Sequence, residues 1–402
     1  MSPVPSRPDP RPPRLSVALV VQRYGTEVDG GSETLCRQVA ERLADSASVE
    51  VLTTTAVDYL TWKNELPAGV AERGGVRVRR FPVASRRWVR RFGRLSERLY
   101  RTPHTIEDEL DWMIRQGPRT PELLAYLKDA RPRFDAFVFF TYLYYPTYFG
   151  LPLVAGKSVL VPTLHDEPPA HFDIFRSLFW LPRAFVWNTP EERDLAREMF
   201  GIEGEGEVAG IGIDPPEAQA PDGFRRRHGL REFLLYVGRL DVWKGIPELL
   251  DHFARYRAER APDLTLVLAG KPHMKLPSQA GVVPVGYLED GEKMQALAAA
   301  SATIIPSPFE SLSVVALESW AVGTPVAASA RSRAVVGQCA RSRAGLAYST
   351  YEDFRSALDR LRSSEGRDLG ENGRRFVAEQ CSWDRILAVY RRAIERASGG
   401  GR

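Results

Sequence analysis

Residues 303–318 read TIIPSPFESLSVVALE and join an apolar strand to a helix through a short loop. The strand occupies 303–306, and its apolar run without polar alternation is typical of a strand covered on both faces. The loop carries Glu310 and the helix carries Glu318, with seven residues between them. Strand, loop and helix together are the repeating element of a parallel, doubly wound α/β sheet, so we expect that architecture here.

The same alternation of apolar strands and helices extends over the rest of the chain. In the first half, strands are expected at 15–21, 49–54, 76–81, 136–140, 158–162 and 184–187. After a stretch rich in Gly, Pro and acidic residues at 210–223, the pattern restarts with strands at 233–237, 264–269, 282–285, 303–306 and 325–328. Residues 383–397 have the pattern of one more amphipathic helix. The sequence therefore predicts two Rossmann-like α/β domains.

The composition excludes several classes of protein. A chain of 402 residues, 44% of them hydrophobic, is long enough for two cores, and a net charge of only +4 gives no support for a nucleic-acid partner. Three widely separated cysteines predict neither a disulfide framework nor a metal site, which fits a reducing cytoplasm. The apolar runs are too short or too often broken by proline to span a membrane. We therefore expect a soluble, cytoplasmic protein with a disordered start at 1–14.

The loop and helix at 308–318 have the pattern of a ligand site. A helix that starts around Ser311 to Ser313 would offer unpaired backbone N–H groups to a phosphate. Glu310, in the loop, would reach hydroxyls of an attached sugar, and Glu318, about two turns further on, would reach a ribose. The alternative is a helix with an acidic start and one solvated glutamate. The position directly after a strand favours the ligand site.

A second group of charges follows the strand at 233–237. Gly238-Arg239 and Lys244-Gly245 lie where a strand ends and a helix begins, which is where ligands bind in open α/β sheets. The fork of Arg239 can hold phosphate oxygens and Lys244 adds a compact charge, so together they would neutralise a diphosphate leaving group. Two solvated cations are the alternative. Because the chain has 48 arginines and only 7 lysines, a lysine beside a turn glycine favours a function.

Three further positions give weaker signals. Gly30-Gly31 precede Glu33 after the first strand and let backbone approach a ligand, although the full dinucleotide-binding pattern is missing. His165 follows a strand, where a lone histidine is more often structural, but this strand end favours a cleft position. Tyr287, after the strand at 282–285, is a candidate neighbour of a nucleotide base.

Taken together, the motifs resemble the retaining glycosyltransferases of the GT-B fold, family four, also called group 1. GGxE at 30–33, GR…KG at 238–245 and E-x7-E at 310–318 carry the resemblance, which extends over essentially the whole chain. It implies two Rossmann-like domains that face each other across a cleft. The acceptor domain would occupy 15–213 and the nucleotide-sugar donor domain 214–382. A helix at 383–402 would then cross back onto the first domain.

The resemblance also implies roles for individual residues. Arg239 and Lys244 would bind the donor diphosphate, Glu310 the donor sugar and Glu318 the ribose. His165 and Glu310 are the predicted catalytic residues. The predicted donor site as a whole consists of Gly31, Arg239, Lys244, Tyr287, Glu310, Ser311, Leu312, Ser313 and Glu318. Members of the family need no metal and no cofactor. The stretch 331–339 departs from the common pattern, because a glutamate expected there is missing.

The predicted function is transfer of a hexose-type sugar, with retention, from a nucleotide-diphosphate sugar to a hydroxyl of a glycan, a lipid-linked acceptor or a specialised metabolite. A glycoside hydrolase is disfavoured, since it needs two carboxyl groups about 5 to 10 Å apart across one bond, usually from different elements. A nucleotide-sugar epimerase on the same fold and a non-catalytic partner subunit remain alternatives. The second is disfavoured because Arg239, Lys244 and Glu310 are all present.

The segment 86–101 combines arginines with apolar residues. Trp88, Phe92, Leu95 and Leu99 have helical spacing, with arginines on the other faces. A solvated helix that covers the first domain is the favoured interpretation. The alternative is peripheral contact with the inner membrane face, which would suit a lipid-linked acceptor.

Overall fold

The computed structural model describes residues 14–399 apart from 29, 204–205 and 217–220, so the predicted disordered start lies outside the described residues except for its last position. The chain divides into two compact units. The first unit comprises 1–160, 180–184 and 393–402, and the second comprises 161–179 and 185–392. Within the described residues, no helix has the length and apolar character needed to cross a bilayer.

The strands form two sheets. The first has the order β3-β4-β2-β1-β5-β6-β7-β8 and the second the order β11-β10-β9-β12-β13-β14. The bounds in the first sheet are β1 (Ser16–Val20), β2 (Ser48–Thr54), β3 (Gly69–Arg73), β4 (Val76–Phe81), β5 (Ala136–Phe140), β6 (Ser158–Val161), β7 (Ala184–Trp187) and β8 (Gly206–Val208). The second sheet consists of β9 (Phe233–Val237), β10 (Thr265–Ala269), β11 (Val282–Gly286), β12 (Ala302–Ile305), β13 (Val326–Ser329) and β14 (Gly345–Tyr348).

Fifteen α-helices accompany these strands within the described residues. They are α1 (Gly31–Leu43), α2 (Val89–Arg101), α3 (Ile106–Gln116), α4 (Pro121–Ala130), α5 (Tyr145–Gly150), α6 (Ile174–Leu178), α7 (Pro190–Phe200), α8 (Pro221–His228), α9 (Ile246–Arg260), α10 (Asp290–Ala299), α11 (Val314–Ala321), α12 (Arg333–Ser342), α13 (Tyr351–Leu361), α14 (Ser364–Gln380) and α15 (Trp383–Ser398). The last helix belongs to the second unit up to residue 392 and to the first unit from 393.

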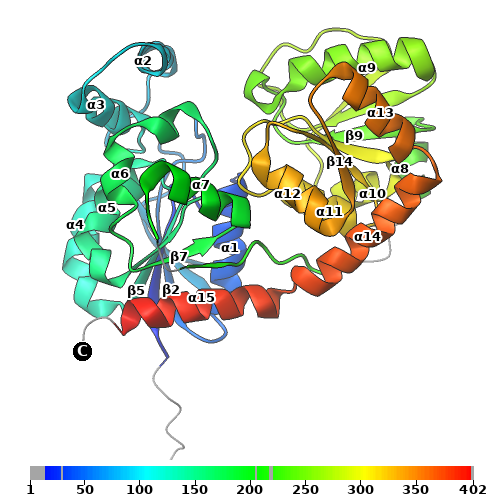
Figure 1. The fold of residues 1–402 in the computed structure, drawn as a ribbon. Helices are drawn as coiled ribbons and strands as arrows, with labels where there is room; N and C mark the ends of the chain where they lie inside the picture. The colour runs from blue at the N-terminus through cyan, green and yellow to red at the C-terminus, as the bar shows by residue number, and fades with distance from the viewer. Residues whose placement is uncertain (1–13, 29, 204–205, 217–220, 400–402) are drawn as a thin grey trace, which may run out of the picture. The chain divides into compact units, whose positions relative to one another are not determined.

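Helices cover both faces of the second sheet (Figure 1). Because side chains alternate along a strand, Leu234 and Tyr236 of β9 pack with α9 and α13 on one face. Their neighbours Phe233 and Leu235 pack with α8 and α10 on the other. Burial on both faces explains the continuous apolar runs, and the strand pairs of this sheet are parallel, as predicted.

Every predicted strand is present within two residues of its expected bounds, but β3, β8 and β14 were missed. Each of the three is an edge strand of its sheet and is poorly buried, although the fourth edge strand, β11, was predicted. An edge strand has one neighbour and less apolar surface to cover, so its sequence lacks a long apolar run. β3 pairs antiparallel to β4 through the turn at Gly74-Gly75, so it does not belong to the parallel strand-and-helix pattern that predicts the other strands.

Candidate functional site

The two strongest motifs meet at the carboxyl ends of β9 and β12. Lys244 closes a short 3-10 turn (Val242–Lys244) after β9, and its Nζ lies 2.6 Å from Oε1 of Glu310, in the loop after β12. The turn is capped by Asp241, whose carboxylate accepts from the Lys244 amide at 2.8 Å. Residues 66 positions apart in the sequence therefore form an ion pair at one sheet edge.

Gly245 allows these two loops to approach each other. Its φ of +76° lies in the left-handed region, and a Cβ there would stand 2.5 Å from the carbonyl oxygen of Pro306. A side chain at this position would be strained and would also push the β12 loop away. Glycine is thus required for the contact between Lys244 and Glu310.

Arg239 lies on the same loop as Lys244. Its Nε is 3.9 Å from Oδ2 of Asp241, and its carbonyl oxygen accepts from the Tyr236 hydroxyl at 2.7 Å. Burial, followed by the charge of nearby Glu310, raises the pKa of Tyr236. The neutral phenol therefore holds the backbone of Arg239, on the same loop that carries Lys244.

The helix after this loop begins at the C-terminal end of the predicted range. Helix α11 begins at Val314, and Ser313 is its N-cap, whose Oγ accepts from the Ala316 amide at 3.3 Å. The amide of Ser313 donates to Oε1 of buried Gln338 at 3.4 Å. Ser311 and Leu312 thus precede the helix, and of the three predicted amides that of Ser313 already has an acceptor. Gln338 belongs to the stretch 331–339 that departs from the family pattern.

Glu318 lies in α11 and has a partner that sequence reasoning missed. Nζ of Lys293, in the first turn of α10, is 2.8 Å from Oε1 of Glu318 and 3.0 Å from Oδ1 of Asp290. Burial raises the pKa of Glu318, and the Lys293 ammonium opposes this shift. Tyr287, predicted beside the base, is 51% exposed and lies 5.0 Å from the ammonium of Lys271.

His165 follows β6 and also belongs to the second unit. Its ring centroid lies 5.9 Å from that of Phe309, next to Glu310 in the chain. Within the described residues its Nδ1 has no hydrogen-bond partner, and Oε1 of the Glu167 carboxylate is 3.5 Å away. His165 and Glu310 line one small pocket of about 50 Å³. The two predicted catalytic residues are therefore neighbours.

A buried glutamate, also missed by sequence reasoning, supports the segment that carries His165. The carboxylate of Glu192 accepts from the amides of Leu164, at 2.7 Å, and Asn188, at 2.5 Å. Burial raises the pKa of Glu192 to about 8 although these amides lower it. A larger pocket of about 360 Å³ adjoins this region. Its charged lining consists of Asp166, His171, Arg176, Glu198 and Arg333.

In the first unit, Gly31 begins α1 and has open space around its Cα. The glutamate of the GGxE motif is not exposed to a ligand. Glu33 is buried and accepts from Nε of Arg23 at 2.9 Å. This acidic residue therefore fixes the loop between β1 and α1 and crowds Gly30, so Gly31 is the part of the motif that a ligand can approach.

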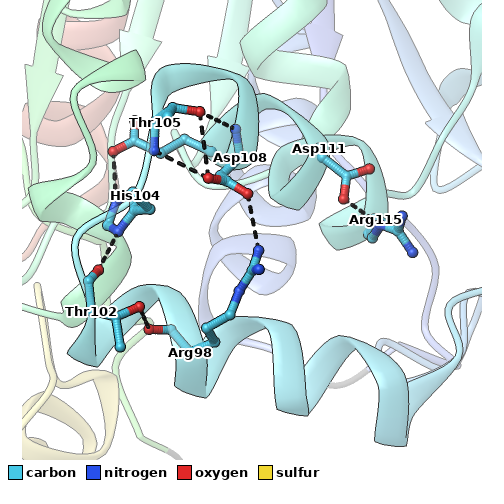
Figure 2. Close-up of polar contacts among 8 residues, drawn as sticks. Arg98, Thr102, His104, Thr105, Asp108, Asp111 and Arg115 are labelled. Carbon is cyan, nitrogen blue, oxygen red and sulfur yellow. Dashed lines mark hydrogen bonds and ion pairs between the residues drawn. The ribbon is translucent and has the colours of Figure 1, made fainter.

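Residues 89–101 form helix α2, whose apolar face packs on α3. The ring of Phe92 lies 5.5 Å from that of Trp112, and Trp112 Nε1 donates to Oγ of Ser96 at 2.8 Å. Figure 2 shows the polar side of this pair, where Arg98 reaches Asp108 at 2.9 Å. The packing of this apolar face agrees with the favoured interpretation of 86–101 as a helix that covers the first domain. Trp88, which lies just before the helix, is 61% exposed.

Known proteins share both sequence and fold with this chain. Residues 231–363 match the family model described as Glycosyl transferases group 1. An MMP alpha-(1->4)-mannosyltransferase of Mycolicibacterium hassiacum is 35% identical over 196 residues, which are 44% of this chain and 47% of that protein. The chain therefore spans about half the length of the curated relative that it matches. The predicted resemblance to group 1 glycosyltransferases is confirmed.

Two solved structures have a similar fold over nearly the full length of this chain. A sucrose-phosphate synthase of Thermosynechococcus elongatus aligns with a TM-score of 0.71 at 19% identity, over 95% of this chain and 100% of that chain. HepE of Anabaena, solved in complex with UDP-glucose, has a TM-score of 0.67 at 14% identity and covers 96% of this chain and 100% of its own. At these identities the likeness concerns the fold. It confirms the predicted pair of α/β domains of the GT-B type.

Proposed function

We propose that this chain transfers a sugar, with retention, from a nucleotide-diphosphate donor to a hydroxyl acceptor. The match of residues 231–363 to the glycosyl transferases group 1 family supports the proposal. The observation that carries the proposal is the ion pair of Lys244 and Glu310 beside Arg239. Cations for a diphosphate and a carboxylate for sugar hydroxyls stand together at the carboxyl edge of a parallel sheet.

Arg239 and Lys244 bind the diphosphate and stabilise its charge as the bond to the sugar breaks. The anomeric carbon loses its phosphate oxygen and gains the acceptor oxygen on the same face, while the acceptor proton passes to a phosphate oxygen. Two fixed cations near the leaving oxygen lower this barrier without reorganisation. Because protein cations supply the charge, we propose that no metal is required.

Glu310 binds the donor sugar. One of its oxygens holds Lys244, and a carboxylate has further lone pairs that can accept from sugar hydroxyls. A hexose suits such a site, and a hexose is also the sugar of two similar proteins, a mannosyltransferase and a protein solved in complex with UDP-glucose. His165, near Phe309, would contact the reacting end of the sugar. Neither an epimerase nor a non-catalytic subunit is favoured by these comparisons.

The larger pocket, of about 360 Å³, is the proposed binding site of the acceptor. Its polar side chains are arranged as pairs, for example His171 with Asp166 at 2.7 Å and Arg333 with Glu198 at 2.7 and 2.9 Å. Such pairs provide many hydrogen-bond donors and acceptors, which suits an acceptor rich in hydroxyl groups.

A surface of α2 and the residues before it supports peripheral membrane contact, which would bring the enzyme to a lipid-linked acceptor. We call this surface the arginine patch, and it consists of exposed Trp88 with Arg86, Arg90, Arg91 and Arg94. Within the described part of the chain, none of these four arginines forms an ion pair. An exposed tryptophan among such arginines is typical of proteins that bind anionic bilayers.

Vesicle binding tests the arginine patch. Replacing Arg90, Arg91 and Arg94 with glutamine should weaken binding to phosphatidylserine vesicles about 100-fold, at about 1 kcal/mol for each arginine. The control replaces three exposed arginines of the second unit, namely Arg226, Arg367 and Arg375. If both triple variants lose the same amount of vesicle binding, the arginine patch is an ordinary solvated surface and not a membrane contact.

A binding screen tests the donor site. Calorimetry with UDP, GDP, ADP and dTDP and their common sugars, in the presence of EDTA, should find one preferred nucleotide. Lys244→Ala should weaken its binding about 10- to 100-fold, because a hydrogen bond to a charged group is lost. If the wild-type chain binds no nucleotide and shows no transfer, the proposed function is wrong.

A further inference from the structure

Both glutamates of the E-x7-E motif pair with a lysine, in a chain that has 48 arginines and only 7 lysines. Glu310 pairs with Lys244, and Glu318 pairs with Lys293, although Lys293 lies in no motif of the sequence. The side chains of Lys293 and Glu318 are only 18% and 16% exposed. The second pair is thus enclosed, and it joins α10, which follows the Tyr287 loop, to α11.

Lys293 is held from two sides. Its ammonium donates to Glu318 at 2.8 Å and to Asp290, which is 88% exposed, at 3.0 Å. An ammonium has three N–H donors, so the two acceptors that the described residues provide leave one N–H for another group. Asp290 anchors the lysine at the surface and Glu318 lies on its inner side.

The pair also sets the charge of Glu318. A buried carboxylate tends to take up a proton, and burial does raise the pKa of Glu318. Burial lowers the pKa of Lys293, but Glu318 and Asp290 raise it by more, so this pKa lies above its ordinary value. The lysine is therefore charged at neutral pH, and its presence favours the ionised glutamate that a hydroxyl donor needs as an acceptor.

We propose that Lys293 is a positioning residue of the donor site, which orients the Glu318 carboxylate for the hydroxyls of the donor ribose. The inference rests on the proposed function, in which Glu318 binds the ribose. Lysine suits this role because its point charge holds one carboxylate oxygen, whereas the fork of arginine would take both.

The ion pair could instead serve only to join α10 to α11. That role predicts a loss of stability and an equal loss of affinity for every nucleotide. A positioning role predicts a loss that depends on the ribose hydroxyls. The two roles are separated by comparing UDP with 2′-deoxy-UDP, or GDP with 2′-deoxy-GDP if the wild-type chain selects guanine.

The experiment measures these affinities by calorimetry on the full chain, for wild type, Lys293→Gln and Glu318→Gln. Wild type should prefer the ribonucleotide about 10- to 100-fold, because a hydroxyl bound to a charged acceptor is lost in the deoxynucleotide. Both variants should bind the two nucleotides almost equally. Arg227→Gln is the matched control, since it removes another ion pair of α10, to Glu292, and should keep the preference.

A second measurement follows the affinity for UDP as a function of pH, in one variant that keeps the ion pair of Lys293 and Glu318 and in one that removes it. Lys293→Arg, which keeps the charge, should bind UDP with little pH dependence, as wild type should. Lys293→Gln should bind more weakly as pH falls, because a buried Glu318 without its cation takes up a proton at higher pH.

Two results would overturn the inference. In the first, Lys293→Gln weakens the binding of UDP and of 2′-deoxy-UDP by the same factor, while Glu318→Gln removes the preference for UDP. Lys293 would then have only a structural role. In the second, wild type itself binds no nucleotide, which removes the proposed function together with this inference. The two failures differ in whether the wild-type chain binds.

Discussion

Replacing Gly245 with alanine should damage both the stability of the second unit and its donor site. The residue is left-handed, and an alanine there costs about 1–2 kcal/mol in backbone strain. Its Cβ would also stand 2.5 Å from the Pro306 carbonyl oxygen, well inside ordinary contact, and that oxygen belongs to the backbone and cannot rotate away. The loops after β9 and β12 must then move apart, which separates Lys244 from Glu310.

The matched control is Gly229→Ala. Gly229 follows α8 with a φ of +62°, but nothing lies within 4 Å of its added Cβ, so this variant carries the strain alone. For a unit of this size, 1 kcal/mol corresponds to about 2–4 °C in Tm. Strain alone should therefore lower the Tm by about 2–8 °C, and Gly245→Ala should lower it further.

Thermal unfolding followed by calorimetric titration with the preferred nucleotide measures both effects. Gly229→Ala should leave nucleotide affinity unchanged, whereas Gly245→Ala should weaken it at least about 10-fold, since one charge-assisted contact is disturbed. If both variants lower the Tm equally and both retain full affinity, the contact with Pro306 does not control the site, and the reasoning from the two loops is refuted.

Three further predictions concern buried polar groups. The pKa of Glu192, about 8 in the folded chain, exceeds its unfolded value, so stability should fall as pH rises from about 5 to 8, and Glu192→Gln should remove this slope in urea unfolding. Arg23→Ala should cost about 3–5 kcal/mol, because Glu33 is left buried without its cation, and Arg23→Ala combined with Glu33→Ala should recover part of this. Ser313→Ala should cost about 1 kcal/mol by removing the cap of α11, and a Tm equal to wild type would contradict that role.

Local sequence patterns determined most of the secondary structure. Apolar runs identified the strands that are covered on both faces, such as β1, β5 and β9, since burial requires such residues there. The same reasoning failed at β3, whose exposed residues alternate little and whose pairing depends on a turn. The start of α11 was predicted only as a range, because Ser311 and Ser313 are equally good caps in sequence, and the structure shows Ser313 as the cap.

The candidate site divides in the same way. E-x7-E and GR…KG were recognised because each is short and lies at a strand end, where a parallel sheet places its ligands. The partners of these motifs were not recognised. Lys293 reaches Glu318 across 25 residues, and Gln338 reaches Ser313 across 25 residues, without any pattern that links them. The sequence by itself determined the two α/β domains and the resemblance to group 1 glycosyltransferases, because burial and strand-end motifs are local. Only the tertiary structure decided which side chain pairs with which, because those pairs depend on the order of strands in the sheet and the packing of helices on it.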